Sequence, residues 1–138
     1  MLRLDIPHER RWLDLARGVR FEAEPATTAL ITTARVRAAR QMTDLRKAVE
    51  DARLAGLPLQ GPDVTDPDIA AGYAFALSCV ALARVTVKDW DGIIGADGKP
   101  AAFDVEKVPQ VLQHPDIAED FWRQMTAAQD ALVAEGNA

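Results

Sequence analysis

The chain has 138 residues, which is the length of one domain and enough to bury a hydrophobic core. Hydrophobic residues make up 49% of it and charged residues 27%, a balance that excludes the composition typical of disordered chains. The net charge of −5 comes from residues 70–138, because basic and acidic residues are equally frequent in residues 1–69, and this argues against a general affinity for nucleic acid.

The sequence predicts a cytoplasmic protein with a single domain, residues 1–138. Its one cysteine, Cys79, lies in "ALSCVALA", which excludes an internal disulfide and indicates a small buried side chain. The stretch "MLRLDIPHERRW" lacks the apolar run of a secretory signal. The longest uncharged run, Ile69–Ala83, is shorter than the roughly 18 to 20 residues that span a membrane, so no membrane contact is expected.

The first predicted element is a β-hairpin over about residues 10–24. In "VRFEAE", apolar Val19, Phe21 and Ala23 alternate with charged residues, which places the apolar side chains on one face of a strand. Gly18 can take a positive φ in the turn before this strand. Pro25 ends the hairpin region, so the chain divides into a hairpin region, 1–25, and a helical region, 26–138.

Two long helices are predicted next, over about residues 27–55 and 66–86. Thr27 or Thr28 can cap the first, whose apolar residues recur every three or four positions until Gly56. The glycine- and proline-rich segment "GLPLQGPDVTDP" predicts a loop, and Asp66 caps the second helix. The second helix lacks charge around its whole circumference up to Arg84, which is typical of the centre of a core or of an assembly interface.

Two further helices are predicted near the end of the chain. Asp104 caps a short one in "VEKVPQVLQ", which Pro109 limits or kinks. A terminal amphipathic helix begins at Pro115 and ends near Gly136. The predicted fold class is therefore mainly α: an N-terminal β-hairpin followed by a helical bundle of two long helices, a Trp/Gly turn region and two C-terminal helices.

The stretch "VKDWDGIIGADGKP", Val87–Pro100, is dense in aspartate and glycine, which are the residues of calcium and phosphate loops. A calcium loop that begins at Asp89 would place Ile93 and Ile94 where an oxygen ligand and a glycine are needed. A phosphate loop fails as well, because Lys99 is followed by proline. The stretch therefore predicts a metal-free structural turn, or a hairpin, with Trp90 buried beneath it.

No residue pattern indicates catalysis, a metal site or a cofactor site. His8 and His114 lack a second ligand at metal-binding spacing. Ser78, the only serine, lies in an apolar segment without a base nearby in sequence. Glu119 and Asp120 lie at the start of the terminal helix, where the helix dipole favours carboxylates without any catalytic role.

The first long helix carries a row of basic residues, which raises the question of nucleic-acid binding. These residues are Arg35, Arg37, Arg40, Arg46, Lys47 and Arg53. Acidic residues are interleaved with them and no aromatic residues are present to stack on bases, so a solvated face is favoured over a nucleic-acid site. A face that contacts another protein remains open.

The order of these segments resembles that of small tail assembly chaperones of tailed bacteriophages and prophages, including gene transfer agents. The resemblance runs through "RWLDLARGVRFEAEPATTAL", the two long helices and "VKDWDGIIGADGKPAAFDVEKVPQVLQHPDIAEDF". The positions that match are Trp90, Gly92, Asp97, Gly98, Pro100, Phe103 and Asp104. Pro109 departs from the uninterrupted helix expected at that place.

The resemblance implies a non-catalytic assembly factor without a cofactor. Its partners would be the tape measure protein and the tail tube protein, with self-association as a further possibility. Candidate partner-binding residues are two basic side chains, Arg35 and Arg46, and the apolar face formed by Ile117, Phe121 and Met125. The alternatives are a small nucleic-acid-binding regulator that uses the Arg-rich helix and a small enzyme whose acidic loop holds a divalent metal.

Overall fold

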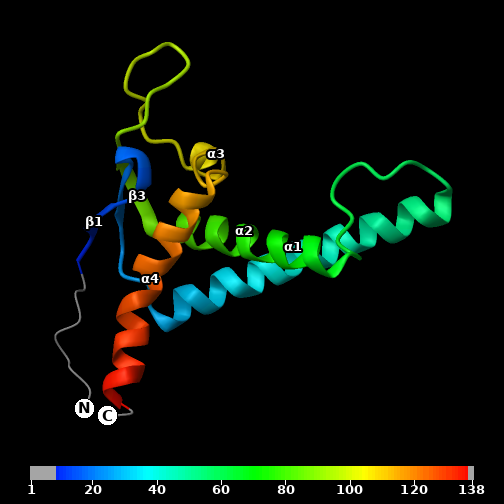
Figure 1. Cartoon of the computed structure of the whole chain (residues 1–138), viewed down its shortest axis with the longest axis horizontal. Helices are drawn as coiled ribbons and strands as arrows, with labels where there is room; N and C mark the ends of the chain where they lie inside the picture. Colours follow the sequence, from blue (N-terminus) through cyan, green and yellow to red (C-terminus); the bar gives the residue numbers. More distant parts are fainter. Residues whose placement is uncertain (1–8, 137–138) are drawn as a thin grey trace.

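A computed structural model describes residues 9–136, with side chains described for residues 9–127, and shows a small sheet packed beside long helices (Figure 1). The chain order is β1 (Arg11–Asp14), β2 (Arg20–Ala23), α1 (Thr28–Ala55), α2 (Pro67–Thr86), β3 (Val87–Asp91), α3 (Val108–Val111) and α4 (Pro115–Gly136). Two 3₁₀ turns, η1 (Ala16–Gly18) and η2 (Val105–Lys107), precede β2 and α3. The predicted fold class, mainly α with an N-terminal β-hairpin, is confirmed.

The hairpin forms because the alternating pattern places one apolar face against the helices. β1 and β2 pair antiparallel with Leu13 opposite Phe21, and both side chains are buried. The connection turns through Arg17 and Gly18, which adopt φ values of 61° and 72°. The positive φ expected at Gly18 is therefore present, and Arg17 shares it.

The sheet has a third strand that the sequence did not predict. β3 pairs antiparallel with β2, with Trp90 opposite Phe21, and a bulge between Glu22 and Ala23 shifts the register. The prediction of a turn is wrong for Val87–Asp91, which is a strand. Val87 and Trp90 are its buried residues, and their spacing of three, allowed by the bulge, hides the period of two that marks a strand.

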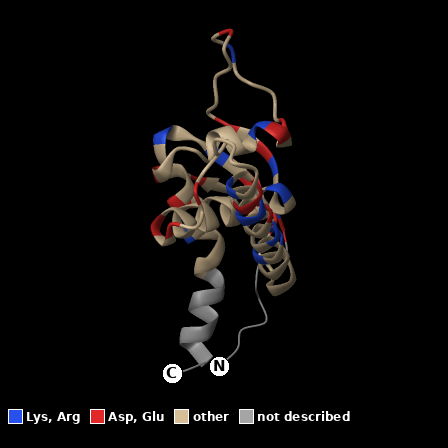
Figure 2. Cartoon of the chain, turned by 90° about the vertical axis from the view of Figure 1, so that its right-hand side faces the viewer, with Lys and Arg blue, Asp and Glu red and all other residues tan. Residues whose placement is uncertain are grey.

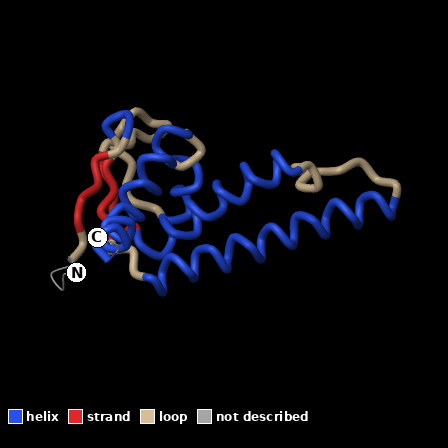
Figure 3. Tube along the Cα trace, turned by 60° about the horizontal axis from the view of Figure 1, so that its bottom comes forward, coloured by secondary structure: helices blue, strands red, loops and turns tan. Residues whose placement is uncertain are grey.

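The two long helices form an antiparallel pair, here called the arm, which extends away from the sheet (Figures 1 and 3). At the start of α1, the Thr27 hydroxyl accepts a hydrogen bond from the Leu30 amide at 3.2 Å, and Gly56 ends the helix at φ 66°. At the start of α2, the Asp66 carboxylate accepts from the Asp68 amide at 2.9 Å. The predicted helix bounds follow from these caps and agree with the structure.

Buried residues form two separate clusters. The larger lies between the sheet, the near half of the arm and α4, and it includes Phe21, Leu82 and Phe121. The smaller lies farther out along the arm, where Met42, Val49 and Val64 are buried. The outer part of the arm therefore depends on much less buried apolar surface than the body does.

The helix α2 is long and apolar enough to cross a membrane by length and composition alone. It has 20 residues and a mean hydropathy of 1.6 in its most apolar window. Only 28% of that window is buried. One such helix is weak evidence for a membrane span, because the core helix of a soluble protein meets the same criterion.

Candidate functional site

Trp90 fixes the segment that follows the sheet. Its side chain is 6% exposed, and its Nε1 donates a hydrogen bond to the Ala101 carbonyl at 2.8 Å. The Phe103 ring meets it edge-on, with ring centroids 5.2 Å apart. These contacts pull the residues after the loop back onto the sheet, so Trp90 and Phe103 serve packing.

The acidic and glycine residues of the loop form backbone turns. The Asp97 carboxylate accepts a hydrogen bond from the Lys99 amide at 3.0 Å, and Gly98 adopts φ 77°. Pro100 pairs with Ile94 in an isolated β-bridge, and Asp104 caps η2 by accepting from the Glu106 amide. Within the described residues, no group of three or more His, Cys, Asp or Glu side chains is placed to hold a metal ion.

The other side chains considered as nucleophiles or as titratable groups are buried or make contacts within the fold. Cys79 is buried, and burial raises the pKa of its thiol to about 12. The Ser78 hydroxyl donates to the Ala74 carbonyl at 2.8 Å within α2, and Asp120 pairs with Arg123 at 2.6 Å. The His114 carbonyl accepts a hydrogen bond from the Ala118 amide at the start of α4, while His8 lies outside the described residues.

The apolar face of α4 that was expected to bind a partner belongs to the core, which is a correction. Ile117, Phe121 and Met125 are at most 3% exposed. The Phe121 ring packs edge-on against Phe21 of the sheet, with centroids 5.8 Å apart. An amphipathic stripe in a sequence does not reveal whether it meets the rest of its own chain or another protein, and here it meets the sheet.

Apolar side chains are instead exposed along α2 and at the tip of the arm. Ile69, Tyr73 and Phe75 are each about two-fifths exposed, at 39%, 43% and 40%. At the tip, Leu54 and Leu57 are 88% and 66% exposed. The all-round apolar character of α2 in the sequence pointed to either a core or an interface. The structure buries only its inner side.

Two hollows lie beside α2, and Leu77, Val80 and Pro109 line both of them. One, of about 470 Å³, lies between α2, α3 and the start of α4, with Tyr73 and Glu119 among its lining residues. The other, of about 510 Å³, lies between α1, α2 and α3. We call these two neighbouring hollows together the arm groove.

One end of the arm groove is basic. Arg37 and Arg40 of α1 and Arg84 of α2 line the second hollow. Among the described residues, Arg84 lies 3.7 Å from Glu106, whereas neither Arg37 nor Arg40 has a carboxylate within 4 Å. Arg35 and Arg46, the basic residues predicted to contact a partner, are exposed but do not line the groove.

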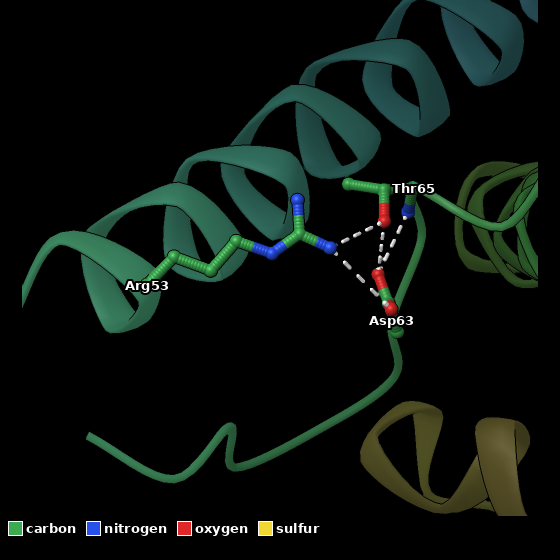
Figure 4. Close-up of polar contacts among 3 residues, drawn as sticks. All are labelled: Arg53, Asp63 and Thr65. Carbon is green, nitrogen blue, oxygen red and sulfur yellow. Dashed lines mark hydrogen bonds and ion pairs between the residues drawn. The ribbon is translucent and has the colours of Figure 1, made fainter. Parts of the chain in front are cut away.

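Basic and acidic residues are interleaved over the rest of the arm, as Figure 2 shows with the tip of the arm toward the reader. At that tip, Arg53 Nη2 donates to the Thr65 hydroxyl at 3.1 Å and lies 3.7 Å from the Asp63 carboxylate (Figure 4). Hydrogen bonds from the Thr65 hydroxyl and amide, followed by the charge of Arg53, lower the pKa of Asp63. This triad ties the loop after α1 to the helix.

Comparison with known proteins supplies no relative: the chain matches no protein-family model, no curated protein and no solved structure. Its function must be argued from the exposed apolar surface and the charges described above. The arm groove, the exposed side of α2 and the exposed leucines at the tip of the arm are features that the fold itself does not use.

Proposed function

We propose that the protein is a non-catalytic tail assembly chaperone, which binds an apolar helical segment of a tape measure protein and keeps it soluble while the tail forms. The resemblance of the sequence to such chaperones supplies the identity of the client. The single observation that carries the proposal is the exposed apolar surface of α2, formed by Ile69, Tyr73 and Phe75, in an arm that extends from the body. Recruitment of tail tube subunits in the bacterial cytoplasm belongs to the same proposal.

The physical reason lies in the distribution of burial along α2. A helix that is apolar all round is stable in water when each side is covered. The inner side of α2 packs on α1, α3 and α4, where Phe75 meets Trp122 edge-on, while Tyr73 and Phe75 each remain about two-fifths exposed. A client helix laid against this surface would gain about 25 cal/mol for each Å² of apolar surface removed from water.

The direct test is co-expression of the full chain with the tape measure protein from the same gene cluster. We expect the client to stay in the soluble fraction and to co-purify with the chain. Because apolar burial drives the contact, the complex should persist between about 50 and 200 mM salt, a range over which binding to DNA would weaken by orders of magnitude. A client that is equally soluble with and without the chain, and that never co-purifies, would show the proposal to be wrong.

A further inference from the structure

We infer that the arm groove is the client-binding site. It selects an amphipathic helix that carries carboxylates at one end of its apolar face, and these carboxylates meet Arg37, Arg40 and Arg84. This inference rests on the proposed function and deepens it by naming the surface and the chemistry of the bound segment. It also names Arg37 and Arg40, which lie between Arg35 and Arg46 on α1, in place of those two residues.

The shape of the groove favours a helix as the occupant. Its two hollows, of about 470 and 510 Å³, both lie along α2. The residues that line both of them are apolar, with Leu77 and Val80 from α2 and Pro109 from α3. Apolar hollows that follow one another along a helix suit a client helix whose apolar side chains recur every three or four residues.

The charges of the groove favour acidic residues at one end of that helix. The guanidinium groups of Arg37 and Arg40 lie three residues apart on α1 and have no described carboxylate partner within 4 Å, and Arg84 has only a long contact with Glu106. Three like charges that line one hollow repel one another weakly, because their side chains are exposed to water, and an anionic group placed there would offset that repulsion. Carboxylates on the client would remove this repulsion and set the register of the helix.

A second copy of the chain fits this groove less well than a separate acidic helix. In a symmetric pair, each groove would meet the same surface of its mate. The carboxylate that lines the groove is that of Glu119, while the nearby Asp116 and Asp120 already pair with Arg17 and Arg123. A mate would thus offer one carboxylate for three guanidinium groups.

Paired charge reversals on α1 test the basic end of the groove. The groove variant carries Arg37→Glu with Arg40→Glu, and the matched control carries Arg35→Glu with Arg46→Glu, so helix, charge change and exposure are the same. All four side chains are exposed, and both variants should keep the circular dichroism spectrum of the parent. With the full-length tape measure protein as the probe, we expect the groove variant to recover the client about tenfold less well, and the control within about twofold of the parent.

Single apolar-to-acidic changes test the other end. Tyr73→Asp lies in the groove, and Val36→Asp on α1 is its control, because Tyr73 and Val36 are 43% and 44% exposed. We expect client recovery to fall for Tyr73→Asp alone. Cross-linking identifies the bound segment of the client. Replacing the acidic residues of that segment with amides should lower client recovery by the parent chain, and should lower it no further for the Arg37→Glu, Arg40→Glu variant.

The outcomes separate this inference from the proposed function. If the parent chain does not capture the tape measure protein, the proposed function fails first. If the parent captures it but groove and control variants behave alike, the groove assignment is overturned and the chaperone function stands. If light scattering shows an oligomer of the chain that Tyr73→Asp dissociates, while client capture is unchanged, the groove is a self-association surface and the inference is wrong.

Discussion

Gly92 connects the third strand to the loop that follows, and it does so against the backbone of the first turn. It adopts φ 78°, a conformation that side chains with a Cβ rarely take. A Cβ added there would overlap with the carbonyl oxygen of Gly18. The close approach of these two glycines therefore lets the turn before β2 lie against the end of β3, just beyond the Arg20–Asp91 pair.

Gly92→Ala should destabilise the protein by at least about 2 kcal/mol, because the strained φ and the clash with Gly18 add together. Gly98→Ala is the matched control: Gly98 has φ 77° but nothing within 4 Å of an added Cβ, so it should lose only about 1 kcal/mol. Urea unfolding of the two variants gives both values. Equal losses would mean that the approach of Gly92 to Gly18 is not as close as described.

Cys79 is the second residue whose environment makes a measurable difference. With its pKa raised to about 12 by burial, the thiol should react with a disulfide reagent at pH 8 only when the protein opens, roughly a thousandfold more slowly than in urea. The labelling rate with increasing denaturant checks this. Rapid labelling of the folded chain would contradict the burial of Cys79 in α2.

At the scale of elements, caps and turn residues made the long helices predictable. Thr27, Gly56 and Asp66 are local signals, since each acts on a backbone group only a few residues away. The strand β3 escaped prediction for two reasons. Its partner, β2, is separated from it in the sequence by both helices of the arm, and the bulge breaks the alternation of buried and exposed residues. Sequence periodicity alone cannot locate a partner so distant in the chain.

The sequence points to part of the proposed site. The apolar circumference of α2 indicates a core or an interface, and the basic row of α1 indicates a solvated face or a face that contacts another protein. The packing of α3 across α1 and α2 decides which of their residues face the groove. No local signal in the sequence indicates that packing. The stripe of Ile117, Phe121 and Met125 was expected to bind a partner, and it packs in the core.

The loop at the tip of the arm should depend on pH through Asp63. Its pKa is lowered from 3.8 in the folded protein, so its contacts contribute stability above that value and are lost as the pH falls through the lower, folded pKa. Thr65→Val removes the largest cause of the shift, and Arg53→Gln a smaller one. A carbon NMR titration should show a larger rise in the pKa of Asp63 for Thr65→Val. A larger effect of Arg53→Gln would reverse the assigned order of causes.

At the scale of the whole molecule, the two buried clusters predict unequal stability along the arm. The outer cluster of Met42, Val49 and Val64 is small, so amides in the outer halves of α1 and α2 should exchange with solvent by local opening, before those of the sheet. Hydrogen exchange followed by mass spectrometry measures both. Uniform exchange over arm and body would show that they open as one unit.

A pair of matched truncations sharpens this prediction. Val49→Ala and Val87→Ala remove the same atoms from side chains that are each 2% exposed, one in the outer cluster and one in the body. We expect Val49→Ala to speed exchange in the outer arm and to leave β2 protected, and Val87→Ala to lower protection throughout.

The position of the arm between β2 and β3 also bears on how the chain reaches this fold. Pairing Phe21 with Trp90 directly would require the closure of a long, flexible loop, which is entropically costly and slow. Helices α1 and α2 are neighbours in sequence and can pair early, and once paired they bring the end of α2 back beside β2. Weakening the outer arm should therefore slow the arrival of the third strand, although no residue of the outer cluster belongs to the sheet.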